Sequence, residues 1–138
     1  MRLVLVLVLG LGLGLVLDPV QARADTGYEL RVPERIALHA GDSGTLAVAI
    51  AVDRGRTISK DAALVLDLAP DGALAVKRRR LGRADAVDPD ADEPRFQIAV
   101  RGESAGDYAI KLHLRFWLCG TKVCRPVDAR RTVAVTVQ

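Results

Sequence analysis

The chain has 138 residues, of which 50% are hydrophobic and 27% charged, and its formal net charge is +3. This length is that of one domain with a real hydrophobic core, which excludes folds that need a metal or disulfides merely to hold together. Because the basic excess is slim, we expect no broad cationic surface and no nucleic-acid partner.

The N-terminus has the pattern of a secretory signal. Arg2 precedes an apolar run, Leu3–Leu17, and Ala22-Arg23-Ala24 places small residues where signal peptidase cuts. The run is shorter than the roughly 20 residues that a membrane-spanning helix needs. We therefore predict a signal peptide at residues 1–24 and a periplasmic or secreted mature domain at residues 25–138. That domain would have no stable membrane insertion after cleavage; an uncleaved anchor is the alternative.

Apolar residues alternate with polar or small residues through the rest of the chain, with a period of two that is typical of half-buried strands. No amphipathic helix is evident. The predicted strands are residues 28–33, 45–52, 63–68, 96–100, 107–118 and 132–137. Without a βαβ signal, these strands predict two antiparallel sheets that cover each other's apolar faces. The sequence thus predicts an all-β fold, an immunoglobulin-like antiparallel β-sandwich of six to seven strands.

Two polar segments, residues 53–62 and 77–95, are predicted loops. The second begins with a basic run, Lys77–Arg80, and ends with acidic residues between Asp85 and Glu93. Since no aromatic residues are interleaved for base stacking, we interpret it as a self-neutralising surface loop. Its acidic half lacks the glycine turn and the distal glutamate of a calcium-binding loop.

The segment Gly41-Asp42-Ser43-Gly44 matches the nucleophile motif of chymotrypsin-like proteases. Those enzymes need two β-barrels to bring a histidine and an aspartate to the serine, and this chain is too short for both. We therefore expect a turn between strands here and no hydrolase site.

The segment at residues 116–127, FWLCGTKVCRPV, holds both cysteines of the chain. If the strand turns back through residues 120–123, Cys119 lies opposite Cys124. The same register places inward apolar residues opposite one another along the hairpin. Leu112 then faces Arg131, which predicts either a bulge or an arginine that extends past the core to solvent.

This register turns Cys119 and Cys124 outward at the hairpin tip, at a separation that permits an exposed disulfide, and it places Trp117 on the same outward face. Three roles remain open: a structural brace, a redox pair and half of a metal site. An exported domain favours a brace, although the closed ring of six residues contributes only about 2 kcal/mol. Lys122 and Arg125 supply positive charge that favours a thiolate and thus a redox pair. We expect no metal or other cofactor, because two thiolates need two further ligands and neither histidine is near.

The hairpin resembles the amino-terminal domain of the DsbD family of periplasmic thiol:disulfide interchange proteins. The resemblance rests on the long alternating strand, the C-x4-C-x-P motif that includes Pro126, and a last strand of alternating valines. It implies an immunoglobulin-like domain in which Cys119 and Cys124 pass electrons between a thioredoxin-like partner and exported substrates. The chain carries neither the membrane electron carrier nor the thioredoxin-like domain of that family, so another protein would supply the electrons.

The sequence therefore supports two hypotheses. In the first, the domain performs thiol–disulfide exchange through Cys119 and Cys124, with Trp117, Lys122, Arg125 and Pro126 supporting the pair or docking a partner. In the second, it is a non-enzymatic secreted binding or structural module in which the disulfide only braces the hairpin.

Overall fold

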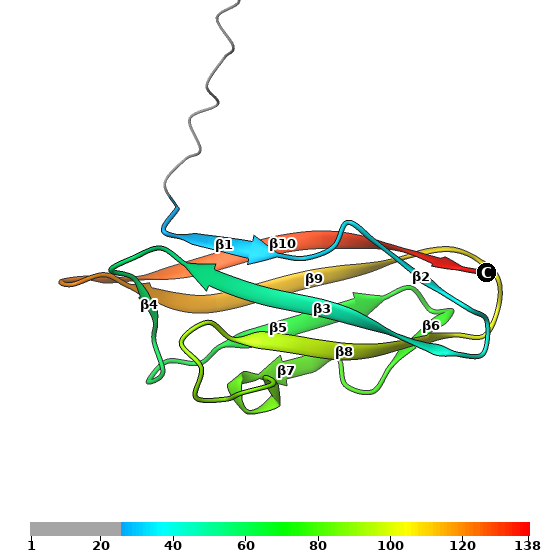
Figure 1. The fold of residues 1–138 in the computed structure, drawn as a ribbon, viewed down its shortest axis with the longest axis horizontal. Coiled ribbons are helices and arrows are strands. Elements are labelled where there is room, and N and C mark those ends of the chain that lie inside the picture. The colour runs from blue at the N-terminus through cyan, green and yellow to red at the C-terminus, as the bar shows by residue number, and fades with distance from the viewer. Residues whose placement is uncertain (1–25) are drawn as a thin grey trace, which may run out of the picture.

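The computed structural model describes residues 26–138, so the predicted signal peptide lies outside the described residues. These residues form ten strands and one short 3-10 helix, η1 (Arg83–Asp85), arranged as two facing sheets (Figure 1). The strands are β1 (Tyr28–Arg31), β2 (Arg35–Leu38), β3 (Ser43–Val52), β4 (Thr57–Ile58), β5 (Val65–Pro70), β6 (Leu74–Val76), β7 (Arg80–Gly82), β8 (Arg95–Gly102), β9 (Gly106–Cys119) and β10 (Cys124–Val137). Residues 26–138 contain no helix long and apolar enough to cross a membrane.

The strand order identifies the architecture. One sheet has four strands in the order β1-β3-β8-β6, and the other has six, β2-β10-β9-β5-β7 with β4 paired to the end of β9. This is the division of an immunoglobulin domain, in which strands A, B, E and D face strands C, F and G. The prediction of an immunoglobulin-like β-sandwich is confirmed.

Two segments switch from one sheet to the other, one at each side of the sandwich. β1 pairs with β3 in the four-stranded sheet, and the chain then crosses so that β2 pairs with β10 in the six-stranded sheet. On the opposite side, β6 pairs with β8 and β7 pairs with β5. Short strands therefore lie at each side of the sandwich, and β2 covers β10 only from Ala134 to Val137.

The sequence analysis missed four short strands. β2, β4, β6 and β7 have two to four residues each, too few to show a period of two. β4 lies inside the predicted loop 53–62, and β7 and η1 lie inside the predicted loop 77–95. The expectation that all strands pair antiparallel is wrong at β2, which runs parallel to β10.

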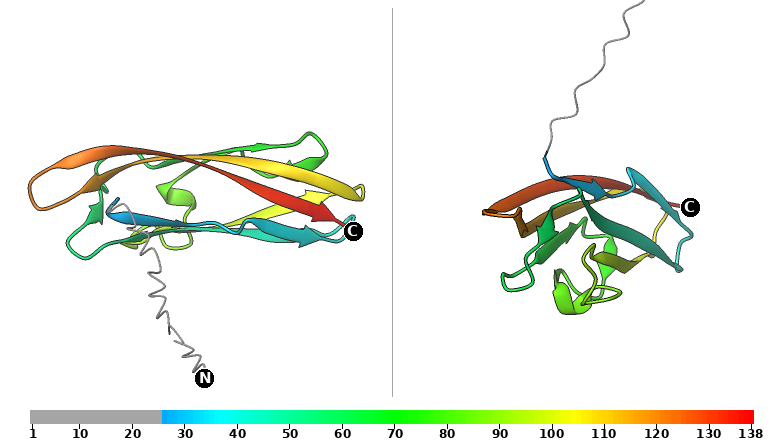
Figure 2. Two further views of the ribbon diagram at one scale, coloured as in Figure 1. Left: turned by 90° about the horizontal axis from the view of Figure 1, so that it is seen from above. Right: turned by 60° about the vertical axis from the view of Figure 1, so that its left-hand side comes forward.

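The core lies between the sheets and is built from the alternating residues that the sequence singles out (Figure 2). The long inward rows include Leu46, Val48 and Ile50 of β3, Phe96, Ile98 and Val100 of β8, and Ile110 to Leu118 of β9. Among residues 26–138, no polar or charged residue is buried. Because successive side chains of a strand point to opposite faces, burial of these rows places the alternate residues of each strand on the surface.

Gly44 allows β2 to pack closely against the start of β3. A Cβ atom at this position would lie 2.1 Å from Leu38 Cδ2, well inside van der Waals contact. Any side chain here would push Leu38 out of the core, in which it is 5% exposed. The glycine thus helps to seat β2 beside β10.

An ion-pair network ties three strands together on the outer face of the six-stranded sheet. Asp67 of β5 accepts a hydrogen bond from Arg80 Nε of β7 at 2.7 Å and from Arg115 Nη2 of β9 at 2.9 Å. Hydrogen bonding to Arg80 is the main reason that the pKa of Asp67 is lowered, and Arg115 adds to the effect. The network favours the charged carboxylate in the folded state.

Truncation of a central core residue should destabilise the domain strongly. Leu114, 1% exposed, lies on β9 between β5 and β10. We expect Leu114→Ala to lower the free energy of unfolding by about 2–5 kcal/mol, measured by urea denaturation. The matched control is Lys111→Ala on the exposed face of the same strand, which should change it by less than about 0.5 kcal/mol. Equal effects would contradict this core.

The Asp67 network predicts a specific loss of stability in acid. Because the folded-state pKa is depressed, the contribution of Asp67 is complete above the unfolded-state pKa and is lost as pH falls through the folded-state pKa. Melting temperatures at about pH 6 and about pH 2.5 should therefore differ more for the wild type than for Asp67→Asn. An identical difference in both proteins would show that the network does not stabilise the fold.

Candidate functional site

The β9–β10 hairpin carries both cysteines and has the register that the sequence predicts. Fourteen residues of each strand pair without interruption. Cys119 lies opposite Cys124, and the inward pairs are Phe116 with Val127, Leu114 with Ala129, Ile110 with Val133 and Tyr108 with Val135. A slip of one residue would turn these apolar rows to solvent, so burial specifies the register.

The pair of Leu112 with Arg131 is the one mismatch in the hairpin, and the structure distinguishes between the predicted bulge and the predicted solvent-exposed arginine. Leu112 lies directly opposite Arg131 in a continuous ladder, so the bulge is wrong. Arg131 is exposed although its parity is inward, and its Nη1 donates a hydrogen bond to the Arg130 carbonyl at 2.8 Å. The arginine therefore extends past the core to solvent. It can do so because no described strand pairs with this side of β10 before Ala134.

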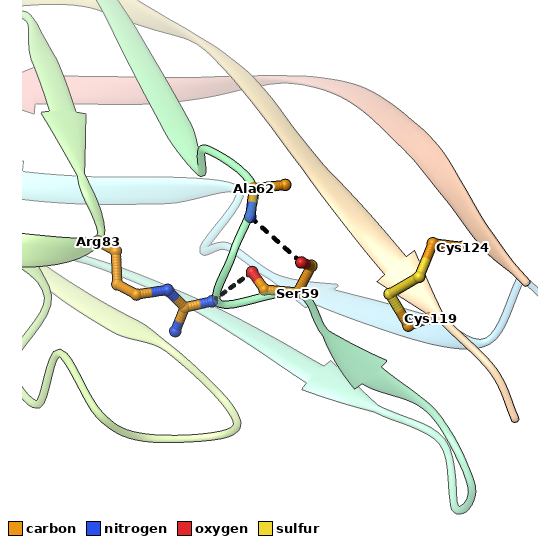
Figure 3. Close-up of a disulfide and its surroundings, with 5 residues drawn as sticks. All are labelled: Ser59, Ala62, Arg83, Cys119 and Cys124. Carbon is orange, nitrogen blue, oxygen red and sulfur yellow. Dashed lines mark hydrogen bonds between the residues drawn. A yellow bond between two sulfur atoms is a disulfide. The ribbon is translucent and has the colours of Figure 1, made fainter.

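Cys119 and Cys124 form a disulfide whose position follows from the hairpin's hydrogen bonds (Figure 3). The Gly120 N–H donates to the Val123 carbonyl at 2.9 Å, which makes these two a hydrogen-bonded pair. The next pair along the ladder, the cysteines, is then a non-hydrogen-bonded pair, in which the Cα atoms come closest. Their Cα atoms are 4.0 Å apart.

The two sulfur-bearing residues differ in exposure, which the sequence analysis did not foresee. Cys124 is exposed, whereas Cys119 is half-buried. The cause is β4, which pairs with the end of β9 so that Thr57 lies beside Cys119 and Ile58 beside Leu118. The prediction that both cysteines are freely exposed is therefore wrong for Cys119, because a two-residue strand covers its edge.

A hollow beside Cys124 is rimmed by cations. It is lined by Arg56, Lys122 and Arg125, with the buried side chain of Leu118 beneath them. Arg125 donates a hydrogen bond from Nη2 to the Thr26 carbonyl, which fixes the guanidinium at this end of the sandwich. The positive charge predicted around the cysteines from Lys122 and Arg125 is therefore present, and it gathers on the Cys124 side.

Arg56 is a part of this rim that sequence reasoning missed. It lies in the turn before β4, far from the cysteines along the chain. Only the pairing of β4 with β9 brings it beside the hairpin tip. No local motif signals this placement, because a two-residue strand has no readable periodicity.

The Cys119 side has a mixed character. A second hollow there is lined by residues of the β4 segment together with Asp92 and Cys119. Lys60 Nζ lies 3.2 Å from Asp92 Oδ1, and Arg83 Nη2 donates to the Ser59 carbonyl at 3.1 Å (Figure 3). The charged loop 77–95 therefore packs toward the β4 segment, which sequence reasoning did not anticipate. Arg78 pairs with Asp85 inside the same loop, as its self-neutralising charges predict.

Trp117 and Pro126 lie directly opposite each other on the outer face, two residues along each strand from the disulfide. Trp117 is 42% exposed, and its carbonyl accepts a hydrogen bond from the Ser59 N–H at 2.9 Å. The indole is thus available at the surface beside the cysteines, on the face where the sequence analysis placed it. Pro126 occupies a non-hydrogen-bonded position, so its missing N–H costs no bond to β9.

The histidines and the GDSG segment lie apart from the disulfide. His113 Nε2 is 2.7 Å from Asp128 Oδ1, in the middle of the sheet. Within residues 26–138, no group of three or more His, Cys, Asp and Glu side chains is arranged to hold a metal ion. The predicted turn at GDSG is confirmed for its first two residues, because Gly41 has φ +83° and the Asp42 N–H donates to the His39 carbonyl at 3.0 Å. Ser43 and Gly44 already belong to β3.

What this geometry can do chemically is limited to the sulfur atoms. A thiolate approaching from solvent can reach Cys124, and breaking the bond would release the sulfur of Cys119. Neither histidine is placed to exchange protons with either sulfur. The site is therefore an oxidised hairpin disulfide with one open side, one covered side and a cationic rim.

No family model matches the chain, and no curated protein is significantly similar to it. Among solved structures, it is similar to trypsin-activated alpha-2-macroglobulin from Escherichia coli, with a TM-score of 0.48 and 14% identity over 79% of this chain. The chain spans only 7% of that protein. Murine CRIg has a TM-score of 0.41 and 7% identity, with 80% of this chain and 98% of that chain covered.

A fimbrial protein is also similar: AggA, the major subunit of aggregative adherence fimbriae type I from Escherichia coli. It has a TM-score of 0.37 and 11% identity, with 80% of this chain and 95% of that chain covered. All three TM-scores are below 0.5, so the assignment of the fold rests on the strand order and pairing of this chain. The molecule is a disulfide-bonded immunoglobulin-like β-sandwich.

Proposed function

We propose that this chain is an exported, non-enzymatic β-sandwich module with a binding or structural role, in which the Cys119–Cys124 disulfide braces the tip of the β9–β10 hairpin. The observation that carries this proposal is the position of the bond. It joins directly opposed residues at the end of an unbroken ladder of fourteen pairs, and β4 covers Cys119. An oxidising compartment, as the predicted signal peptide implies, would keep such a bond closed.

The brace has a clear physical purpose at this place. The hairpin tip extends beyond the two facing sheets (Figure 1), and its residues 120–126 are mostly exposed. Few buried contacts hold such a tip, so fraying would begin there. Closing a six-residue ring limits that fraying and also restricts the unfolded chain.

A second candidate function is thiol–disulfide exchange with a thioredoxin-like partner, as the resemblance to the DsbD family implies. The observation that favours it is the exposure of Cys124 beside Arg56, Lys122 and Arg125. In that reaction a partner thiolate, attracted by the cations beside Cys124, attacks Cys124 Sγ; the S–S bond breaks, and its electron pair leaves on Cys119 Sγ, which takes up a proton from solvent. A second thiol of the partner, after losing its proton, then attacks the mixed disulfide and frees Cys124. The partner is thereby oxidised and both cysteines are reduced.

The reduction potential distinguishes the two functions. For a brace we expect a value below about −300 mV in a glutathione or dithiothreitol redox titration, while exchange requires a value nearer −200 mV. In the same set of measurements, the Cys119→Ser/Cys124→Ser double variant should lose about 2 kcal/mol of unfolding free energy relative to the oxidised protein.

Trapping with single variants provides the matched control. Exchange by attack on Cys124 predicts that Cys119→Ser, which keeps the exposed thiol, accumulates a mixed disulfide with a thioredoxin-like protein. Cys124→Ser, which keeps the half-buried thiol, should accumulate much less. Efficient and selective trapping through Cys124, together with a potential near −200 mV, would overturn the brace in favour of exchange.

A further inference from the structure

One edge of the six-stranded sheet is covered only at its end. β10 pairs with β9 along its full length, but on its other side it pairs with β2 only from Ala134 to Val137. Within the part of the chain that the structure describes, no strand pairs with that side of β10 between residues 124 and 133. β1, which precedes β2, has crossed to the other sheet and pairs with β3.

The hydrogen-bonding groups on this open edge follow from the ladder. The Ala134 N–H donates to the Glu34 carbonyl at 2.9 Å. The backbone N–H and carbonyl groups of even-numbered β10 residues therefore point away from β9. Cys124, Asp128, Arg130 and Thr132 therefore direct an N–H and a carbonyl outward at the open edge, and Pro126 directs a carbonyl only. The open stretch, residues 124–133, is longer than an ordinary strand of about five or six residues, so this edge can accept another strand.

The side chains along the open edge are strongly positive. Arg125, Arg130 and Arg131 are all exposed, and Lys122 lies just before the strand. Asp128 is the only acidic residue between residues 122 and 133, and its carboxylate is already engaged by His113 at 2.7 Å. The side chain of Arg130 lies on the outer face of the sheet, and those of Arg125 and Arg131 lie on the opposite face. A strand added here would therefore have cations beside both of its faces.

We propose that this open edge of β10 binds an extended acidic segment of a partner protein as an additional strand. Main-chain hydrogen bonds would supply the pairing, and the arginines would select acidic side chains of the partner. A second copy of this chain is a poor occupant, because its own arginines would meet like charges and Pro126 lacks a donor. The inference holds whether the disulfide braces the hairpin or exchanges electrons.

The test uses a fluorescent, end-capped peptide of about six residues with alternating glutamate and threonine, titrated at low salt. A matched peptide has lysine in place of glutamate. The Arg130→Glu/Arg131→Glu double variant should bind the acidic peptide on the order of tenfold more weakly. Arg95→Glu, an exposed position on β8 of the other sheet, is the control and should change affinity less than about twofold.

A backbone variant separates strand pairing from simple charge attraction. Thr132→Pro removes one outward N–H without changing charge, and an edge position tolerates proline. It should weaken binding by about five- to tenfold. In the wild type, bound peptide should slow hydrogen exchange at the amides of Cys124, Asp128, Arg130 and Thr132, a readout that does not depend on the variant's folding.

Three outcomes would overturn the proposal. One is the absence of saturable binding of the acidic peptide, and another is equal binding of the lysine peptide. The third is binding without amide protection on β10, which would mean that the arginines attract anions without forming a strand. None of these outcomes bears on the reduction potential, so failure here is distinguishable from failure of the proposed disulfide function.

Discussion

The continuous pairing of β9 with β10 places one row of apolar side chains in the core and, by the same parity, turns Cys119 and Cys124 toward the surface. The remaining elements are arranged around this hairpin. β5 and β4 pair with β9, and β2 pairs with β10. Because the side-chain period of a strand is two, burial of the inner row leaves no freedom in where the outer row points. The disulfide is therefore a consequence of the same register that builds the core.

The short strands determine how accessible the two cysteines are. β4 has only two residues, yet it covers the edge of β9 at Cys119 and brings Arg56 to the hairpin tip. Within residues 26–138, no strand pairs with the corresponding side of β10 before Ala134, so Cys124 and the arginines that follow it remain exposed. The asymmetry of the hairpin arises because β4 is present on one side and β2 begins late on the other. This asymmetry gives the molecule one protected sulfur and one exposed edge.

Some charged side chains of the six-stranded sheet form ion pairs that stabilise it, whereas the arginines of β10 have no carboxylate partner among the described residues. Asp67 is occupied by Arg80 and Arg115. Among the described residues, Arg125 and Arg131 of β10 donate hydrogen bonds to main-chain carbonyls, and no arginine of β10 forms an ion pair with a carboxylate. A paired network of this kind holds neighbouring strands together, whereas cations without a carboxylate at an open edge favour an anionic partner.

The sequence by itself determined the sandwich, the register of the last hairpin and the pairing of the two cysteines. Each of these depends on a period of two that extends over many residues, as in the row from Ile110 to Leu118, and such periods are legible without coordinates. The sequence also placed Trp117 on the outer face and limited Arg131 to two alternatives. Only the tertiary structure decided which cysteine is covered, that Arg56 joins the cations beside Cys124, and that β10 has a free edge before Ala134. Those features depend on strands of two to four residues and on contacts between distant segments, for which no local pattern exists.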